Sequence, residues 1–317
     1  TVSENIGRMW YNTTSNTWKI GVEADGAWST GTALNTGRNN TSCGAAGASP
    51  ATVAFGRTST SPPIGTTLCE TYDGSSWTEV NNGNNARISG GSAGTATACF
   101  WAAGMTPAPT VHRSYMETWD GTCWTEENNT NTARGGGRGV GTITNALLVG
   151  GNPDSSNNIV ESWDGTCWTV AAPPNMVTGA YNGMAAGTSS TSALSVGGGP
   201  DPTGSQVTQE FDGSSWTEKA DLNEGKTSGS GAGTSTDAIV FGGYQYDAPV
   251  PTDSALTEKW NGSSWTEVNS MNTARTNTSG NGTTSSAICA GGYTGTYRNE
   301  VEGWEDPLYS AKTVTTS

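Results

Sequence analysis

The chain has 317 residues, a formal net charge of −14, 45 glycines, 13 tryptophans and a single histidine. This negative charge argues against nucleic acid as a partner, because phosphate binding needs a positive surface, and no run of about 20 apolar residues indicates membrane insertion. One histidine and six cysteines without a CxxC pair supply a metal site poorly. We therefore expect no metal, no cofactor and mostly free thiols.

The first 30 residues carry two short β-patterns that are not full repeats. Residues 8–21, RMWYNTTSNTWKIG, indicate a surface β-hairpin, and residues 23–30 read EADGAWST. The second stretch imitates a hairpin that recurs later in the chain. We therefore expect residues 1–30 to form an N-terminal β extension or linker, with residues 23–30 as one candidate for a strand that completes the last repeat.

From residue 31 onward, one phrase recurs about every 45 residues, which is a period typical of propeller blades. Asp-Gly and Asn-Gly favour tight hairpin turns, and the flanking aromatic residues favour strands. A small-residue strand and an apolar strand ending in glycine fill the rest of each period, which makes four strands per repeat. The phrase reads ETYDGSSWTE from Glu70, ETWDGTCWTE from Glu117, ESWDGTCWTV from Glu161, EFDGSSWTE from Glu210, EKWNGSSWTE from Glu258 and, degraded, EGWEDPLYS from Glu302.

The last copy offers a second way to complete the ring of repeats. Tyr309 stands five residues after Trp304, just as Trp265 follows Trp260. The sixth repeat therefore either completes its own outer strand or takes that strand from residues 23–30. Both alternatives remain open at this point.

The apolar strand ending in Gly-Gly (ALLVGG, 146–151), the aromatic, the tryptophan and the start signal NTAR (131–134) together resemble the kelch repeat. The resemblance covers residues 31–312, although the turn between aromatic and tryptophan is tighter than usual in kelch proteins. It implies an all-β fold: a six-bladed kelch-like β-propeller with four-stranded antiparallel blades, a short N-terminal β-hairpin extension and a C-terminal tail, 313–317. The N-terminal MWYNTTS, the closing KTVTTS and the Thr/Gly/Asn-rich repeats resemble marine-phage tail-fibre or virion structural proteins.

A basic residue opens the small-residue strand in five of the six repeats, and the fourth repeat has Gly179 nearby instead. A closed ring would gather these side chains around its axis at one face, where they would bind a carboxylate, sulfate or phosphate. The alternative is one ion pair per blade, because a glutamate precedes the aromatic in each copy, with Glu210 as the member in the fourth. The basic residues are Arg38, Arg87, Arg134, Lys226 and Arg275.

The loops that follow the Gly-Gly strands differ in length and content, whereas the Asp-Gly turns barely change. Diverse loops on a constant scaffold are typical of binding surfaces, and tyrosines stack on sugar rings while their hydroxyls form hydrogen bonds. The alternative is that these loops vary without function. The predicted contacts are His112, Arg113, Tyr115, Tyr244 and Tyr246.

These patterns favour a noncatalytic binding module, with a phage virion fibre or receptor-binding protein for a host-surface glycan as the leading interpretation. Its expected partners are that glycan or an acidic ligand, other virion or filament proteins and copies of itself, in a virion or outside the cell. The first alternative is a structural or assembly protein, and the second is a sialidase- or mutarotase-like enzyme acting on sugars. One histidine excludes a galactose-oxidase-type copper site. The aspartates at 73, 120, 164 and 212 are interpreted as turn residues.

Overall fold

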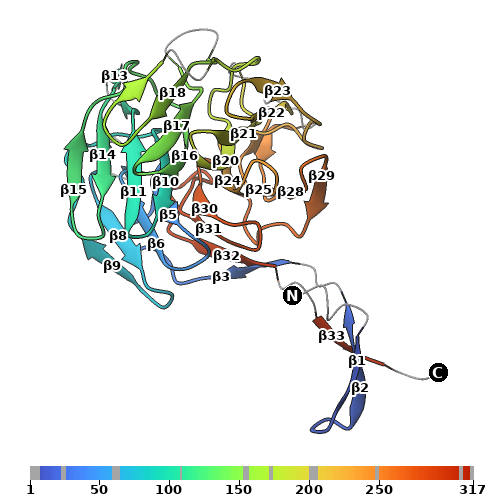
Figure 1. The fold of residues 1–317 in the computed structure, drawn as a ribbon. Coiled ribbons are helices and arrows are strands. Elements are labelled where there is room, and N and C mark those ends of the chain that lie inside the picture. Colours follow the sequence, from blue (N-terminus) through green and yellow to red (C-terminus); the bar gives the residue numbers. More distant parts are fainter. Residues whose placement is uncertain are drawn as a thin grey trace.

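The computed structural model describes residues 8–22, 26–58, 65–107, 109–152, 157–170, 174–199, 206–246, 250–306 and 310–314. Within these ranges all regular elements are β-strands, and six four-stranded antiparallel sheets surround a central axis as the blades of a propeller (Figure 1). The sequence prediction of an all-β, six-bladed propeller is confirmed.

Each blade runs from an inner strand at the axis to an outer strand at the rim. Blade 1 consists of β5 (Ser42–Ala45), β6 (Ala51–Ala54), β8 (Cys69–Tyr72) and β9 (Trp77–Val80). Blade 2 consists of β10 (Gly91–Thr95), β11 (Ala98–Ala102), β14 (Met116–Trp119) and β15 (Trp124–Glu127). Blade 3 consists of β16 (Arg138–Thr142), β17 (Asn145–Val149), β18 (Val160–Trp163) and β19 (Trp168–Thr169).

Blades 4 and 5 follow the same order, and blade 6 takes its outer strand from the other end of the chain. Blade 4 consists of β20 (Met184–Ser189), β21 (Ser192–Val196), β22 (Thr208–Phe211) and β23 (Trp216–Glu218). Blade 5 consists of β24 (Ser230–Gly233), β25 (Ala238–Phe241), β28 (Thr257–Trp260) and β29 (Trp265–Val268). Blade 6 consists of β30 (Ser279–Gly282), β31 (Ser286–Ala290), β32 (Val301–Glu305) and β3 (Ala27–Thr30).

The ring is closed by strand β3, which pairs antiparallel with β32 and places Trp28 opposite Trp304. The six inner strands contact one another in a complete circle, since β30 of blade 6 packs against β5 of blade 1. Tyr309, on which the other closure alternative rested, lies outside the described residues. The ring therefore joins the start and the end of the chain within one blade.

A small sheet stands beside the disc, in the order β1-β2-β33 (Figure 1). Strands β1 (Met9–Asn12) and β2 (Thr17–Val22) form the predicted N-terminal hairpin, and β33 (Ser310–Thr313) pairs with β2. Both described ends of the chain thus meet in one sheet. Residues 27–30 belong to the disc, whereas residues 310–313 belong to this small sheet.

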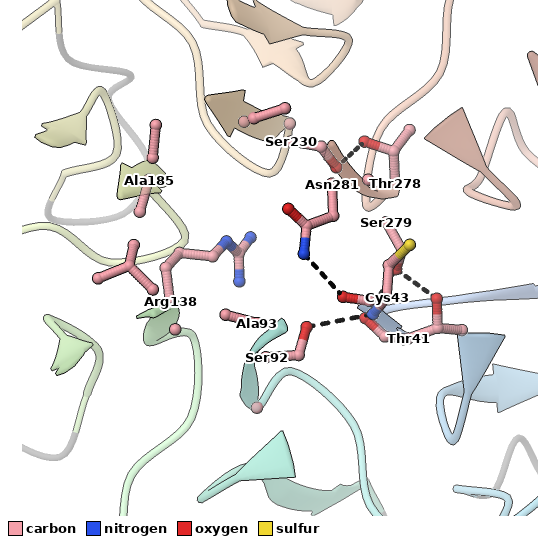
Figure 2. A pocket seen from close by; sticks show the side chains of 18 of the residues that line it. Thr41, Cys43, Ser92, Ala93, Arg138, Ala185, Ser230, Thr278, Ser279 and Asn281 are labelled. Carbon is pink, nitrogen blue, oxygen red and sulfur yellow. Dashed lines mark hydrogen bonds between the residues drawn. The ribbon is translucent and has the colours of Figure 1, made fainter. Parts of the chain in front are cut away.

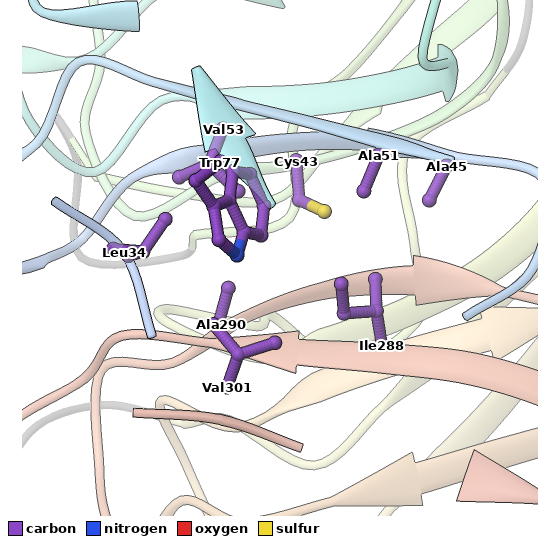
Figure 3. Close-up of a cluster of buried hydrophobic side chains, with 9 residues drawn as sticks. All are labelled: Leu34, Cys43, Ala45, Ala51, Val53, Trp77, Ile288, Ala290 and Val301. Carbon is purple, nitrogen blue, oxygen red and sulfur yellow. The ribbon is translucent and has the colours of Figure 1, made fainter. Parts of the chain in front are cut away.

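The core lies between the blades, because each apolar second strand alternates its side chains between two neighbours. In β31, Ile288 and Ala290 pack against Val53 and Trp77 of blade 1 (Figure 3). Their neighbours Ala287 and Cys289 pack toward blade 5, in a cluster with Ile239 and Phe241. No blade buries its own surface alone, so each blade depends on both neighbours.

The Asp-Gly phrases form hairpin turns at the face of the disc that we call the turn face, defined by residues 73–76, 120–123, 164–167, 212–215 and 261–264. In blade 1, Asp73 Oδ1 accepts hydrogen bonds from the N–H groups of Ser75 and Ser76, both at 2.8 Å, and Gly74 has a φ of +102°. Asn261 accepts the same two bonds in blade 5. The interpretation of these aspartates as turn residues is confirmed.

The opposite face, which we call the loop face, carries the loops between the second and third strands and the connections between blades. Three two-stranded sheets lie there: β4 (Arg38–Asn39) with β7 (Arg57–Thr58), β12 (Met105–Pro107) with β13 (Thr110–His112), and β26 (Tyr244–Gln245) with β27 (Thr252–Asp253).

Candidate functional site

The five basic residues predicted to ring the axis are fully buried, each with a relative exposure of 0 %. Each forms an ion pair with a glutamate of the blade that it enters, which is the pairing alternative weighed from the sequence. Each of these positive charges is therefore paired with a buried glutamate, and none of the five side chains is exposed at the loop face. The pairs are Arg38–Glu70, Arg87–Glu117 (2.5 Å), Arg134–Glu161 (2.6 Å), Lys226–Glu258 (3.1 Å) and Arg275–Glu302 (3.2 Å).

An asparagine three residues before the basic residue completes each of these buried sites. In blade 3, Asn131 donates its backbone N–H (2.7 Å) and its side-chain amide (3.0 Å) to one oxygen of Glu161. The other oxygen accepts from the Thr132 N–H (3.1 Å) and from Arg134. Four donors therefore satisfy the buried carboxylate, which is the condition under which a buried ion pair is tolerated. The recurring Asn-x-x-Arg spacing was the signal for this arrangement.

Blade 4 departs from this pattern, and the sequence prediction placed its residues wrongly. The strand register puts Gln209, not Glu210, at the position of Glu161. Ala180 occupies the position of Arg134. The Ala180 carbonyl accepts a hydrogen bond from the Gly151 N–H, just as the Arg134 carbonyl accepts one from the Gly104 N–H. The buried cation and the buried carboxylate are therefore replaced together.

The neutral residues of blade 4 satisfy each other. Gln209 accepts from the Thr178 N–H (3.0 Å) and donates to the Thr178 carbonyl (2.7 Å). Glu210 instead points outward, to Lys219 at 2.9 Å, in a partly exposed pair. The fourth blade thus shows which neutral residues this fold accepts at the site.

The predicted loop contacts form two separate groups on the loop face. In blade 2, the Arg113 guanidinium lies 5.7 Å from the centre of the Tyr115 ring, and His112 lies nearby on β13. In blade 5, the rings of Tyr244 and Tyr246 meet edge to face at 4.7 Å. All five side chains are partly exposed. Blades 2 and 5 stand on opposite sides of the axis, so the structure does not bring the two groups together.

Sequence reasoning missed a second tyrosine pair, in blade 6. Tyr293 and Tyr297 meet edge to face at 5.4 Å in the loop between β31 and β32. The available signal was the same as in blade 5: tyrosines closely spaced after Gly-Gly. Aromatic residues therefore gather on the loop face in three blades.

A hydrogen-bonded collar surrounds the axis where the inner strands begin. Its six residues have positive φ values between 51° and 73°, a conformation that Gly and Asn adopt more readily than other residues. Backbone N–H groups bond from one blade to the preceding one, for example Gly136 to Ser89 at 2.7 Å and Ser228 to Asn182 at 2.7 Å. The collar consists of Asn40, Ser89, Gly136, Asn182, Ser228 and Asn277.

Below this collar, the inner strands of all six blades line an axial pocket of about 60 Å³ (Figure 2). Its wall is mostly glycine, alanine and small hydroxyl side chains. Arg138 of β16 is the one charged residue among those that line it, and its guanidinium points into the pocket. Sequence reasoning missed Arg138, although RGGGRG (134–139) is the one repeat with a cation within its small-residue strand.

Among the described residues, no group of three or more His, Cys, Asp or Glu side chains is placed to hold a metal ion. All six cysteines are free. In the part of the chain that the structure describes, no helix is long and apolar enough to cross a membrane.

Comparison with known proteins identifies the fold. No family model matches the sequence, and no curated protein matches it. The solved structure entitled "Structure of YjhT" is similar to this chain with a TM-score of 0.67 and 12 % sequence identity, covering 88 % of this chain and 99 % of that one. At this identity the similarity establishes a shared propeller architecture.

Proposed function

We propose that this propeller is a noncatalytic binding module that recognises a host-surface glycan through its loop face, as a fibre or receptor-binding protein of a phage virion. The observation that carries the proposal is the contrast between the two faces. The turn face repeats one hydrogen-bonded turn, whereas partly exposed aromatic residues occupy the loop face in three blades, as tyrosine pairs in blades 5 and 6 and as Tyr115 beside Arg113 in blade 2. Aromatic rings that keep a polar end exposed suit the alternating apolar and hydroxyl surfaces of sugars.

The small sheet β1-β2-β33 supports attachment at one place. It gathers both described ends of the chain beside the disc (Figure 1), so a tether there leaves the loop face free. The resemblance of the sequence repeats to kelch repeats and of residues 8–21 to phage fibre segments is the basis for proposing a virion or extracellular location. Several copies on one particle would add avidity to weak single sites.

A glycan array followed by titration of the purified chain tests this proposal. We expect selective binding that weakens about tenfold in Tyr244→Ala or Tyr115→Ala, the usual range for a central aromatic contact. Tyr11→Ala is the matched control, because Tyr11 is 47 % exposed and lies in the small sheet. Unselective binding, or equal loss in the Tyr11 variant, would contradict glycan recognition by the loop face.

One observation favours the first alternative, a structural or assembly protein. Met9, Tyr11 and Trp18 of the small sheet are 47–52 % exposed, and exposed aromatic residues are common in protein interfaces. A particle or filament in which this chain packs against neighbours through both faces would favour this role. Turnover of a sialyl or aryl glycoside by the same preparations would favour the enzyme alternative.

A further inference from the structure

Arg138 occupies a position that is small or apolar in the other blades. It pairs with Val149 of the second strand, and the corresponding strand-pair positions define its equivalents. A cation at this place is therefore a feature of blade 3 and not part of the repeat. The equivalents are Ser42, Gly91, Met184, Ser230 and Ser279.

No carboxylate among the described residues pairs with Arg138. Arg138 donates a hydrogen bond to the Gly137 carbonyl at 3.3 Å, whereas the five buried basic residues that open the inner strands all pair with glutamates. Burial lowers the pKa of Arg138 to about 10, so the side chain is still charged at neutral pH. Arg138 is partly exposed, and its guanidinium points into a pocket without an acidic residue in its lining.

The pocket wall adds hydroxyl donors to this charge. Ser92 Oγ accepts a hydrogen bond from the Cys43 N–H at 3.1 Å, which leaves the hydroxyl proton of Ser92 to donate. Ser230 and Thr278 share one hydrogen bond at 3.0 Å, and both hydroxyl-bearing residues line the pocket. The Asn281 amide bonds the carbonyls of Cys43 (3.4 Å) and Gly94 (3.2 Å) and so fixes the opposite wall (Figure 2).

The size of the pocket limits its occupant. A volume of about 60 Å³ holds about four water molecules. It suits a single compact group. A guanidinium with neighbouring hydroxyl donors is the donor set that oxyanions prefer.

We infer that the axial pocket binds one small oxyanion, a phosphate, a sulfate or a single carboxylate group, held by the Arg138 guanidinium and the hydroxyls of Ser92 and of the Ser230–Thr278 pair. The oxyanion supplies the negative charge that blade 3 lacks at the axis. This site is independent of the proposed glycan site, because its residues lie on the inner strands and not in the loops.

Calorimetric titration of the whole chain with sulfate, phosphate, acetate and glucuronate, at constant ionic strength, tests the inference. We expect one saturable site per chain. Binding should weaken at least tenfold in Arg138→Met, which introduces the residue that Met184 provides in blade 4, and less in Arg138→Lys, which keeps a point charge. Arg298→Met is the matched control, because it removes an equal charge from a partly exposed pair with Glu300, and it should bind within twofold of the parent chain.

Two further readouts keep the test decisive. If Arg138→Met does not fold, the arginine Nε–H resonance of Arg138 in the unmodified chain should still shift on titration with sulfate and saturate with the calorimetric curve. Preference for sulfate and phosphate would identify a tetrahedral ligand, and preference for acetate and glucuronate would identify a carboxylate; both outcomes support the site. Absence of saturable binding, or equal binding by Arg138→Met, would overturn it. Glycan binding that persists in that case would leave the proposed function intact.

Discussion

The buried ion pair of blade 3 and its neutral counterpart in blade 4 allow a quantitative prediction. Arg134→Ala and Glu161→Gln, made singly and together, give blade 3 the residues that blade 4 holds as Ala180 and Gln209. Arg134 and Glu161 are both 0 % exposed. Each single change leaves one buried charge without its partner, whereas the double change leaves none.

The expected costs follow from that burial. Removing one partner of a buried ion pair costs about 3–5 kcal/mol, so independent effects would sum to about 6–10 kcal/mol. We expect the double variant to cost no more than either single variant, because the introduced glutamine can exchange two hydrogen bonds with Thr132 as Gln209 does with Thr178. The coupling between the two changes is then at least about 3 kcal/mol.

Urea unfolding followed by tryptophan fluorescence measures this cycle, with unchanged m-values as the condition for comparing midpoints. The same cycle on Lys219→Met and Glu210→Gln is the control. That pair is 34 % and 21 % exposed, so its coupling should stay within about 1 kcal/mol. Additive costs in blade 3, or equal coupling at the two sites, would refute the argument that charge pairing governs this position.

Three further predictions address the turns, the thiols and the ring closure. The pKa values of Asp73 and Asp212 lie at about 2, below the ordinary 3.8, because turn N–H and hydroxyl groups donate hydrogen bonds to the two carboxylates. The stabilisation that these carboxylates provide is therefore present above about pH 4 and is lost as the pH falls toward 2. The urea midpoint of unfolding should drop over this pH range, and it should drop less in Asp212→Asn, which copies Asn261. Burial raises the pKa of Cys43 to about 12 and of Cys69 to about 11. Ellman's reagent should therefore modify only the exposed Cys123 and Cys167 in the native chain. Early modification of Cys69, detected by mass spectrometry, would contradict this prediction. Trp28→Ala should cost about 3–5 kcal/mol, since Trp28 packs 4.8 Å from Phe241 and 5.7 Å from Trp304; Trp18→Ala, 52 % exposed, should cost far less, and equal midpoints would contradict closure by β3.

The fold was predictable from the sequence because each hairpin carries its own turn and aromatic residues, and six similar units bury their surfaces only against one another. The sequence could not decide which of the two candidate segments, residues 23–30 or the segment around Tyr309, supplies the strand that closes the ring. Residues 23–30 imitate the hairpin phrase, but only the pairing of Trp28 with Trp304 shows which copy they complete.

The candidate site was less predictable, for reasons that are visible at individual residues. The fourth phrase is one residue shorter before its turn, so its glutamate seemed equivalent to Glu161, whereas the strand register assigns that place to Gln209. The burial of Arg134 depends on the Asn131–Glu161 arrangement in three dimensions. Arg138 gains its importance only when six strands enclose a pocket that no single repeat contains.

Closure by β3 also determines how the molecule carries load. The first strands of the chain pair with the last ones twice, in β2–β33 and in β3–β32. A pull applied at the two ends is therefore transmitted directly between these pairs. These two pairs bear the load first, and opening of the disc also requires separation of β30 from β5.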